Sequence, residues 1–343
     1  PGLIDLHAHV FPYGSAIGIP ADELVANQST TTLVSAGDAG ANNIAAFRRF
    51  IVPATRARLY AFVHIANHGL TGFPVPELYN IEFAQVDAAA RAIAENSDIV
   101  LGAKVRMSEN VIAKHGMEPL KRAILACERA GTGGKVMCHI GGVETPGLMS
   151  QILDTLRAGD VLTHAYSGAP NIGNAFTNIV QDGKLLPAAV EAKKRGVVFD
   201  VGHGGGSFDY TIAEAAIAGG AGPDVISSDI HVFSGNSPGM PYLTWVMSKF
   251  MNLAGQGYQQ DAQGGDSTGR GARRCVAARG GRRAGQLCRH AQQQARRQDP
   301  YQTGGRRDRR CCVRAAVPVA VCGAVTSKID QHEARAPSCW LFG

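Results

Sequence analysis

Two histidines one residue apart, His7 and His9, give the first indication of chemistry in this sequence. They follow an apolar run, and alternate residues of a strand share a face, so both imidazoles are expected to point the same way. Two imidazoles at the end of a strand can bind one metal ion. Asp5 lies on the same face and could orient one imidazole from behind the metal. Taken alone, the pair also fits two ordinary histidines near a terminus.

Lys104 lies in the apolar segment 99–106, where an ammonium group is costly to bury. One interpretation is a structural lysine that is paired with a carboxylate such as Asp229. The other is a lysine that has reacted with CO2, because the resulting carbamate is an anion that can bridge two metal ions. The residue alone does not separate these interpretations.

His139 and His164 occupy equivalent places at the ends of two further apolar segments, and Asp229 ends another. Alone, each histidine would more often be a hydrogen-bonded core residue, and Asp229 could cap a helix. Together with the earlier residues they supply four imidazoles, one potential carbamate and one carboxylate, which suits two borderline divalent ions, zinc first. The predicted two-metal site consists of His7, His9, Lys104, His139, His164 and Asp229.

The elements that must position these residues form a repeated pattern of short apolar runs and helix-like stretches. The expected strands are 3–10, 31–37, 59–66, 99–106, 136–142, 161–167, 197–204 and 225–231. The expected helices are 43–56, 83–96, 118–130, 147–158, 186–195, 210–218 and 242–253, several of them followed by glycine. Eight such units favour an α/β fold of the (β/α)8 TIM-barrel type, in which functional residues lie at the carboxyl ends of the strands. An open doubly wound sheet is the alternative.

Composition divides the chain into two parts. Residues 1–255 carry 18 Lys+Arg and 22 Asp+Glu, whereas residues 256–343 carry 16 and 6, together with six of the eight cysteines. The first part is typical of a globular cytoplasmic protein with reduced thiols. The Arg-rich tail would fit a nucleic-acid-binding arm. We interpret it instead as a frameshifted translation, because folded segments seldom have this composition.

The segment 1–9 resembles the opening strand of the amidohydrolase superfamily, and the order His-x-His, Lys, His, His, Asp resembles its binuclear members. More narrowly, 102–106, 200–208 and 227–231 look like a bacterial group of dihydroorotase-like amidohydrolase/deacetylases, which includes esterases acting on acetylated α-hydroxy acids. The resemblance implies a hydrolase TIM barrel at 1–255 and a tail at 256–343 that is not family-like. It also implies a small β-sandwich domain, which we expect to be truncated or disrupted.

By this resemblance, the N-terminal histidine pair and Asp229 would bind the more buried metal ion, and His139 and His164 the more exposed one. Lys104, as a carbamate, would bridge both ions. A hydroxide between the metals would attack the carbonyl carbon of an ester or amide. Asp229 would take the proton of the attacking water and deliver it to the leaving group.

Residues that could contact the substrate follow the same strands. Arg106 could pair with a substrate carboxylate, or it could form a structural salt bridge. His203, Gly204 and Gly205 begin a glycine run whose backbone N–H groups could cradle an anion, or which could be a flexible loop. His231 could orient the nearby carboxylate or contact the substrate, or it could be an ordinary loop histidine.

We therefore predict a metal-dependent hydrolase that cleaves an ester or amide bond of a small carboxylate-bearing substrate. The alternatives are a dihydroorotase-like cyclic amidase or imidase, a mononuclear deaminase, and an inactive truncated fragment. A deaminase would not need Lys104 in its metal site. The expected partner is a small molecule rather than a membrane or a nucleic acid, and a homo-oligomer is compatible with this interpretation.

Overall fold

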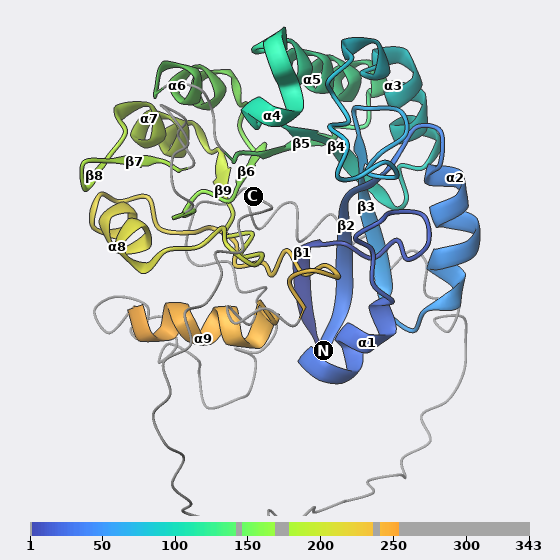
Figure 1. Ribbon diagram of the computed structural model, residues 1–343, viewed down its shortest axis with the longest axis horizontal. Coiled ribbons are helices and arrows are strands. Elements are labelled where there is room, and N and C mark those ends of the chain that lie inside the picture. Colours follow the sequence, from blue (N-terminus) through green and yellow to red (C-terminus); the bar gives the residue numbers. More distant parts are fainter. Residues whose placement is uncertain (1, 142–145, 169–177, 236–240, 254–343) are drawn as a thin grey trace, which may run out of the picture.

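The computed structural model describes residues 2–141, 146–168, 178–235 and 241–253. A parallel sheet curls through the centre of this part of the chain, with the strand order β1-β2-β3-β4-β5-β6-β9 (Figure 1). Its seven strands are β1 (Leu3–Ala8), β2 (Thr30–Gly40), β3 (Arg58–His64), β4 (Val100–Arg106), β5 (Lys135–His139), β6 (Val161–Thr163) and β9 (Val198–Phe199). A separate antiparallel pair is formed by β7 (Val180–Gln181) and β8 (Lys184–Leu185).

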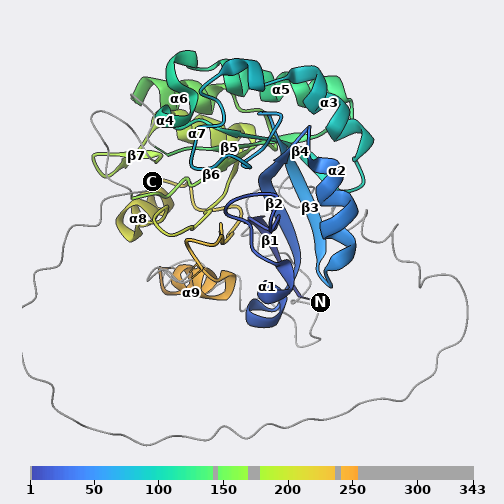
Figure 2. The same ribbon diagram turned by 45° about the vertical axis from the view of Figure 1, so that its right-hand side comes forward.

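Helices surround the outer side of the curled sheet, as Figures 1 and 2 show. They are α1 (Ala21–Gln28), α2 (Ile44–Ala46), α3 (Val86–Glu95), α4 (Glu109–Ile112), α5 (Glu118–Ala130), α6 (Pro146–Thr155), α7 (Pro187–Arg195), α8 (Tyr210–Ala218) and α9 (Leu243–Leu253). As predicted, α5 and α7 end at glycines in the left-handed conformation, Gly131 and Gly196. Within the described ranges, no helix has the length and apolar composition that a bilayer crossing requires.

Several predicted elements are shorter or more irregular in the structure. The helix expected at 43–56 is α2 followed by a π-helix at Phe47–Ile51 and a 3-10 turn at Val52–Ala54. The eighth strand expected at 225–231 forms only isolated parallel bridges, from Val225 to Asp200 and from Ile230 to Ala8. Asp229 has a φ of 48°, which does not continue a strand. The observed fold is a mixed α/β fold with a curled seven-stranded sheet.

The segment 256–343, which we interpret from its composition as a frameshifted tail, lies outside the described residues. Within the described residues, the sheet separates two hydrophobic clusters. The main core lies between the strands and the helices, and a smaller cluster lies on the opposite face of the sheet. The smaller cluster includes Phe62, Met137, Val161 and Val198. The residues two positions later along the chain are His64, His139, Thr163 and Asp200. Because alternate residues of a strand share a face, polar groups collect above an apolar floor at the carboxyl ends of the strands.

Candidate metal centre

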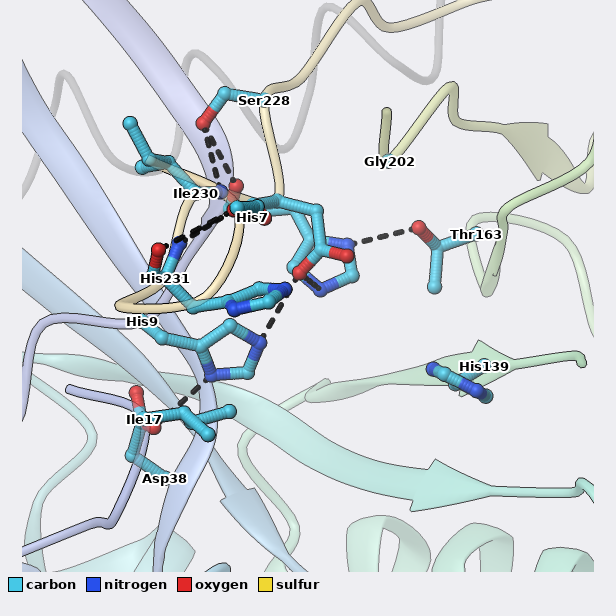
Figure 3. A network of polar contacts seen from close by, with 12 residues as sticks. His7, His9, Ile17, Asp38, His139, Thr163, Gly202, Ser228, Ile230 and His231 are labelled. Carbon is cyan, nitrogen blue, oxygen red and sulfur yellow. Dashed lines mark hydrogen bonds and ion pairs between the residues drawn. The ribbon is translucent and has the colours of Figure 1, made fainter. Parts of the chain in front are cut away.

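Three buried side chains converge at the end of β1. His7 Nε2 lies 3.0 Å from Asp229 Oδ1, and His9 Nε2 lies 3.1 Å from the same oxygen (Figure 3). One ligand atom from each of the three residues lies within 4.8 Å of the others. The structure thus joins the predicted N-terminal pair to a carboxylate that is 220 residues later than His9.

The hydrogen bonds of His9 show that this cluster requires a cation. His9 Nδ1 lies 2.9 Å from Asp38 Oδ1, so both ring nitrogens face carboxylate oxygens. A neutral imidazole has one N–H, so one of these contacts would be between two acceptors. Burial alone lowers the pKa of His9, but Asp38 and Asp229 together raise the pKa to about 9. Either a proton on His9 or a bound metal ion supplies the missing positive charge.

A hydroxyl group, that of Thr163, orients the ring of His7. Thr163 Oγ1 donates to Asp200 Oδ2 over 2.7 Å, so Thr163 accepts the hydrogen bond from His7 Nδ1, which lies 2.8 Å away. The network therefore places the lone pair of His7 on Nε2, which faces Asp229. With His9, this makes two imidazole nitrogens and one carboxylate oxygen that point at one another. Such a donor set fits a divalent metal ion.

Lys104 reaches the same cluster from β4. It is 1% exposed, and its Nζ lies 3.3 Å from His7 Nε2 and 3.4 Å from Met137 Sδ. Burial lowers the pKa of Lys104 to about 8, although Asp229 and Asp200 act in the opposite direction. A larger fraction of the amine is therefore uncharged at neutral pH than for an exposed lysine.

His139 and His164 form a second pair beside the first. His139 Nδ1 lies 2.9 Å from His164 Nε2, and His164 Nε2 lies 3.9 Å from Asp229 Oδ2. His164 Nδ1 faces the carbonyl oxygen of Gly202 at 2.7 Å, so this nitrogen carries the proton and Nε2 carries the lone pair. Burial lowers the pKa of His164 to about 3, and burial and His164 hold the pKa of His139 well below its usual value. Both rings are neutral and can act as metal ligands.

Within the described residues, Asp5 forms its hydrogen bonds with the backbone of His7 and with Ser228 rather than with an imidazole ring, contrary to the prediction. Its carboxylate accepts hydrogen bonds from the backbone N–H of Ser228 at 3.0 Å and from the Ser228 hydroxyl. The register of β1 is irregular between Asp5 and Ala8, so simple alternation does not place Asp5 beside the histidines. Burial raises the pKa of Asp5 to about 6. Asp5 therefore ties β1 to the residue before Asp229.

Unusual backbone geometry also brings the ligands together. Asp229 and His164 have φ values of 48° and 66°, in the left-handed region that non-glycine residues rarely adopt. Gly202 has a φ of 48°, and a Cβ there would lie 2.9 Å from His164 Nδ1 and 3.1 Å from His7 Nδ1. Strained residues of this kind collect at functional sites.

Arg106 lies in a separate polar cluster. Its Nη1 lies 3.1 Å from Glu77 Oε2, and Glu77 Oε1 lies 3.2 Å from His64 Nε2. The guanidinium also lies 5.8 Å from the centre of the Phe73 ring. Of the two interpretations of Arg106, the structure contains the salt bridge, and contact with a substrate stays a prediction.

The other predicted substrate residues differ in their surroundings. His203 is buried, and its Nδ1 lies 2.7 Å from the carbonyl oxygen of Gly204. The Gly204 N–H is already used in a backbone hydrogen bond, whereas Gly205 is exposed. The ring of His231 lies 5.9 Å from that of His9.

Sequence reasoning missed the residues that orient the ligands. Asp38 directly follows the predicted strand 31–37, Asp200 directly follows the observed strand β9, and Thr163 directly precedes a predicted ligand. Their positions carried a signal, because polar residues at strand ends collect in one place. Their partners could not be identified, since each contact joins different strands.

Curated deacetylases resemble this chain in sequence. No protein-family model matches the chain. A deacetylase of Agrobacterium fabrum is 36% identical over 254 residues, which are 74% of this chain and 60% of that protein. A deacetylase of Brucella anthropi is 35% identical over 254 residues, 74% of this chain and 61% of that protein. The chain thus spans about 60% of the length of these curated relatives.

Two crystal structures resemble the fold. One, described as a dihydroorotase, has a TM-score of 0.67 and 36% identity, and the match covers 74% of this chain and 64% of that one. The other, described as an adenine deaminase, has a TM-score of 0.68 and 30% identity, and the match covers 76% of this chain and 68% of that one. The chain belongs to the amidohydrolase superfamily, which confirms the resemblance of its motifs.

Proposed function

We propose that this chain is a metal-dependent hydrolase that cleaves an ester or amide bond of a small carboxylate-bearing substrate, as a deacetylase does. The observation that carries the proposal is the group of His7, His9 and Asp229, whose donor atoms lie within 4.8 Å of one another in a buried site. The similarity to two proteins named deacetylases supports the reaction class.

The proposed first metal ion would be held by His7, His9 and Asp229, and the second by His139 and His164. Imidazole and carboxylate donors favour zinc in both places. Divalent ions bound there would acidify a water molecule and polarise the carbonyl group to be attacked. We also propose that Lys104 carries a carbamate, since its lowered pKa makes the reactive neutral amine more available to CO2.

Asp229 is the proposed proton carrier. Its Oδ1 is occupied by His7 and His9, whereas its Oδ2 lies on the side of His164 and Gly204. The neighbouring histidines, His7 first, outweigh burial and keep the pKa of Asp229 well below its usual range. The carboxylate is therefore ionised and able to accept a proton at Oδ2 before passing it to a leaving group.

Substrate recognition is proposed for the residues around this centre. Arg106 would pair with the substrate carboxylate while Glu77 holds the guanidinium from the other side. His203, Gly204, Gly205 and His231 are proposed contacts of weaker support, because the structure uses some of their polar atoms internally. The substrate would be a small molecule.

We also propose that the curled sheet closes into a full barrel. Segment 225–230 bridges to β9 at one end and to β1 at the other, which supports closure of the sheet into a (β/α)8 barrel. The barrel would be formed by residues 1–255. A cytoplasmic location stays a prediction from the thiol content of that part.

The first experiment is the metal content of the full chain, expressed with zinc and bicarbonate and measured by elemental mass spectrometry. Two equivalents support the binuclear site, and none in folded protein refutes the proposal. The His139→Asn variant should lose metal. His115→Asn is the matched control, because His115 Nε2 contacts the carbonyl oxygen of Tyr79 and none of the predicted ligands.

A substrate panel then separates the candidate reactions. It contains N-acetyl amino acids, O-acetyl hydroxy acids, cyclic ureides and adenine. Acetate release from the first two groups supports the proposed deacetylase. Ring opening of ureides alone would favour the dihydroorotase-like alternative, and ammonia release from adenine would favour a deaminase, the activity named for one structural neighbour.

A further inference from the structure

Helix α9, the orange helix in Figure 1, carries Lys249. Lys249 Nζ lies 2.7 Å from His203 Nε2. His203 Nδ1 lies 2.7 Å from the carbonyl oxygen of Gly204, which can only accept a hydrogen bond. The proton of the His203 ring is therefore on Nδ1, and Nε2 accepts from Lys249.

Aromatic packing holds this pair in place. The Phe208 ring stacks on the His203 ring with centroids 5.2 Å apart, and Lys249 Nζ lies 5.8 Å from the centre of the Phe208 ring. Phe250, the next residue of α9, is 1% exposed and contacts Phe208 with centroids 5.3 Å apart. The packing of α9 against Phe208 therefore fixes the position of Lys249 relative to the His203 ring.

His203 lies in a backbone segment that contacts two predicted metal ligands. The carbonyl of the preceding residue, Gly202, accepts the hydrogen bond that orients His164. The following residue, Gly204, lies against Asp229, since a Cβ added there would lie 2.7 Å from Asp229 Oδ2. The backbone N–H groups of His203 and Gly204 donate to the carbonyls of residues 227 and 228, directly before Asp229. A displacement of His203 would thus move the backbone that contacts His164 and Asp229, the two predicted ligands.

We propose that Lys249 is a positioning residue of the metal centre, which acts through His203 on the placement of His164 and Asp229. Its effects on metal affinity and on turnover rest on the proposed function, whereas its effect on His203 does not.

The test compares Lys249→Met, Lys249→Arg and Ser248→Ala in the full 343-residue chain. Methionine keeps the length and helix propensity of lysine but cannot donate a hydrogen bond. Arginine retains a donor, and Ser248 is an exposed neighbour on the same helix. A Lys249→Gln variant replaces the methionine variant if the latter does not fold.

The first measurement is nitrogen NMR of histidine-labelled protein, with the His203 signal assigned from a His203→Gln sample. Burial is the main cause that lowers the pKa of His203 to about 4; Lys249 acts in the same direction, and the hydrogen bond to Gly204 and the charge of Asp229 oppose both. In Lys249→Met, His203 should titrate at higher pH and lose the fixed Nδ1–H form. Lys249→Arg should retain that form, and Ser248→Ala should match the parent chain.

The second measurement is zinc affinity by competition with a chelator. Lys249→Met should weaken zinc binding about tenfold, the lower end of the range for lost support of a metal ligand. Parental zinc affinity together with a parental His203 signal would refute the role of Lys249. If the parent chain binds zinc but hydrolyses no substrate, the proposed reaction fails and both measurements still decide the role of Lys249; if it binds no zinc, the proposed function fails and a parental His203 signal in Lys249→Met still refutes the hold of Lys249 on His203.

Discussion

Replacing Gly202 with alanine should damage the metal centre, whereas the same change at Gly206 should not. A Cβ at Gly202 would lie 2.3 Å from Thr163 Oγ1, 2.9 Å from His164 Nδ1 and 3.1 Å from His7 Nδ1. Thr163 would have to move by roughly 1 Å to reach an ordinary contact distance. This movement would lengthen the 2.8 Å hydrogen bond that orients His7.

The expected cost of Gly202→Ala has two parts. The left-handed backbone, with a φ of 48°, costs a residue with a Cβ about 1 kcal/mol. A buried hydrogen bond lost between Thr163 and His7 costs about 1–3 kcal/mol. The free energy of unfolding should therefore fall by about 2–4 kcal/mol. Zinc affinity should fall about 10–100-fold, because His7 loses its orienting partner.

Gly206→Ala is the matched control, since Gly206 is exposed and an added Cβ would meet no atom within 4 Å. Urea unfolding of the metal-free protein and a zinc competition titration measure the two effects. If both glycine variants unfold at the same urea concentration and bind zinc as the parent does, the placement of Gly202 against the two histidines is wrong.

Three further outcomes are expected. Lys104→Ala should lower the metal content from two equivalents to at most one by elemental mass spectrometry, while Lys184→Ala, at an exposed lysine, should not; unchanged metal in Lys104→Ala would contradict the binuclear site. Because the pKa of His9 is raised to about 9, zinc must displace a proton from His9 below that pH. Zinc affinity should therefore rise about tenfold per pH unit towards pH 9, with proton release detectable by calorimetry in different buffers. An affinity that does not change between pH 7 and 8.5 would refute this. Arg106 and His64 lower the pKa of Glu77 from 4.5 to about 2 despite burial, so the carboxylate stabilises the fold above pH 4.5 and loses this effect as the pH falls towards 2. Glu77→Gln should therefore lower the free energy of unfolding near neutral pH by on the order of 3 kcal/mol, and its difference from the parent should shrink in acid urea titrations; a constant difference would contradict the ion-pair account.

Sequence alone predicted the sheet and the convergence of the histidines, because apolar runs report burial and parallel strands end on one side. Seven of the eight expected strands are present, and the superfamily is confirmed. The segment 225–231 was the exception. Its serines hydrogen-bond to Asp5 and Asp200, and Asp229 turns the backbone away from strand geometry.

The contacts that orient the ligands could not be predicted from periodicity. His9 pairs with Asp38 across two strands, and Arg106 pairs with Glu77 from a loop. A single carboxylate near a strand end does not identify its partner, because the partner depends on register and on side-chain rotamers. Strand irregularities such as that between Asp5 and Ala8 also change which residues share a face.

The join between β1 and segment 225–230 has a consequence for biosynthesis. His9 is translated 220 residues before Asp229. At about 5–20 residues per second, the two histidines leave the ribosome roughly 10–45 s before the carboxylate that is proposed to complete their ligand set. Under the proposed function, a zinc ion that arrives early would meet only the histidine pair, so stable loading of the centre would follow the closing of this join and come late in the folding of the nascent chain.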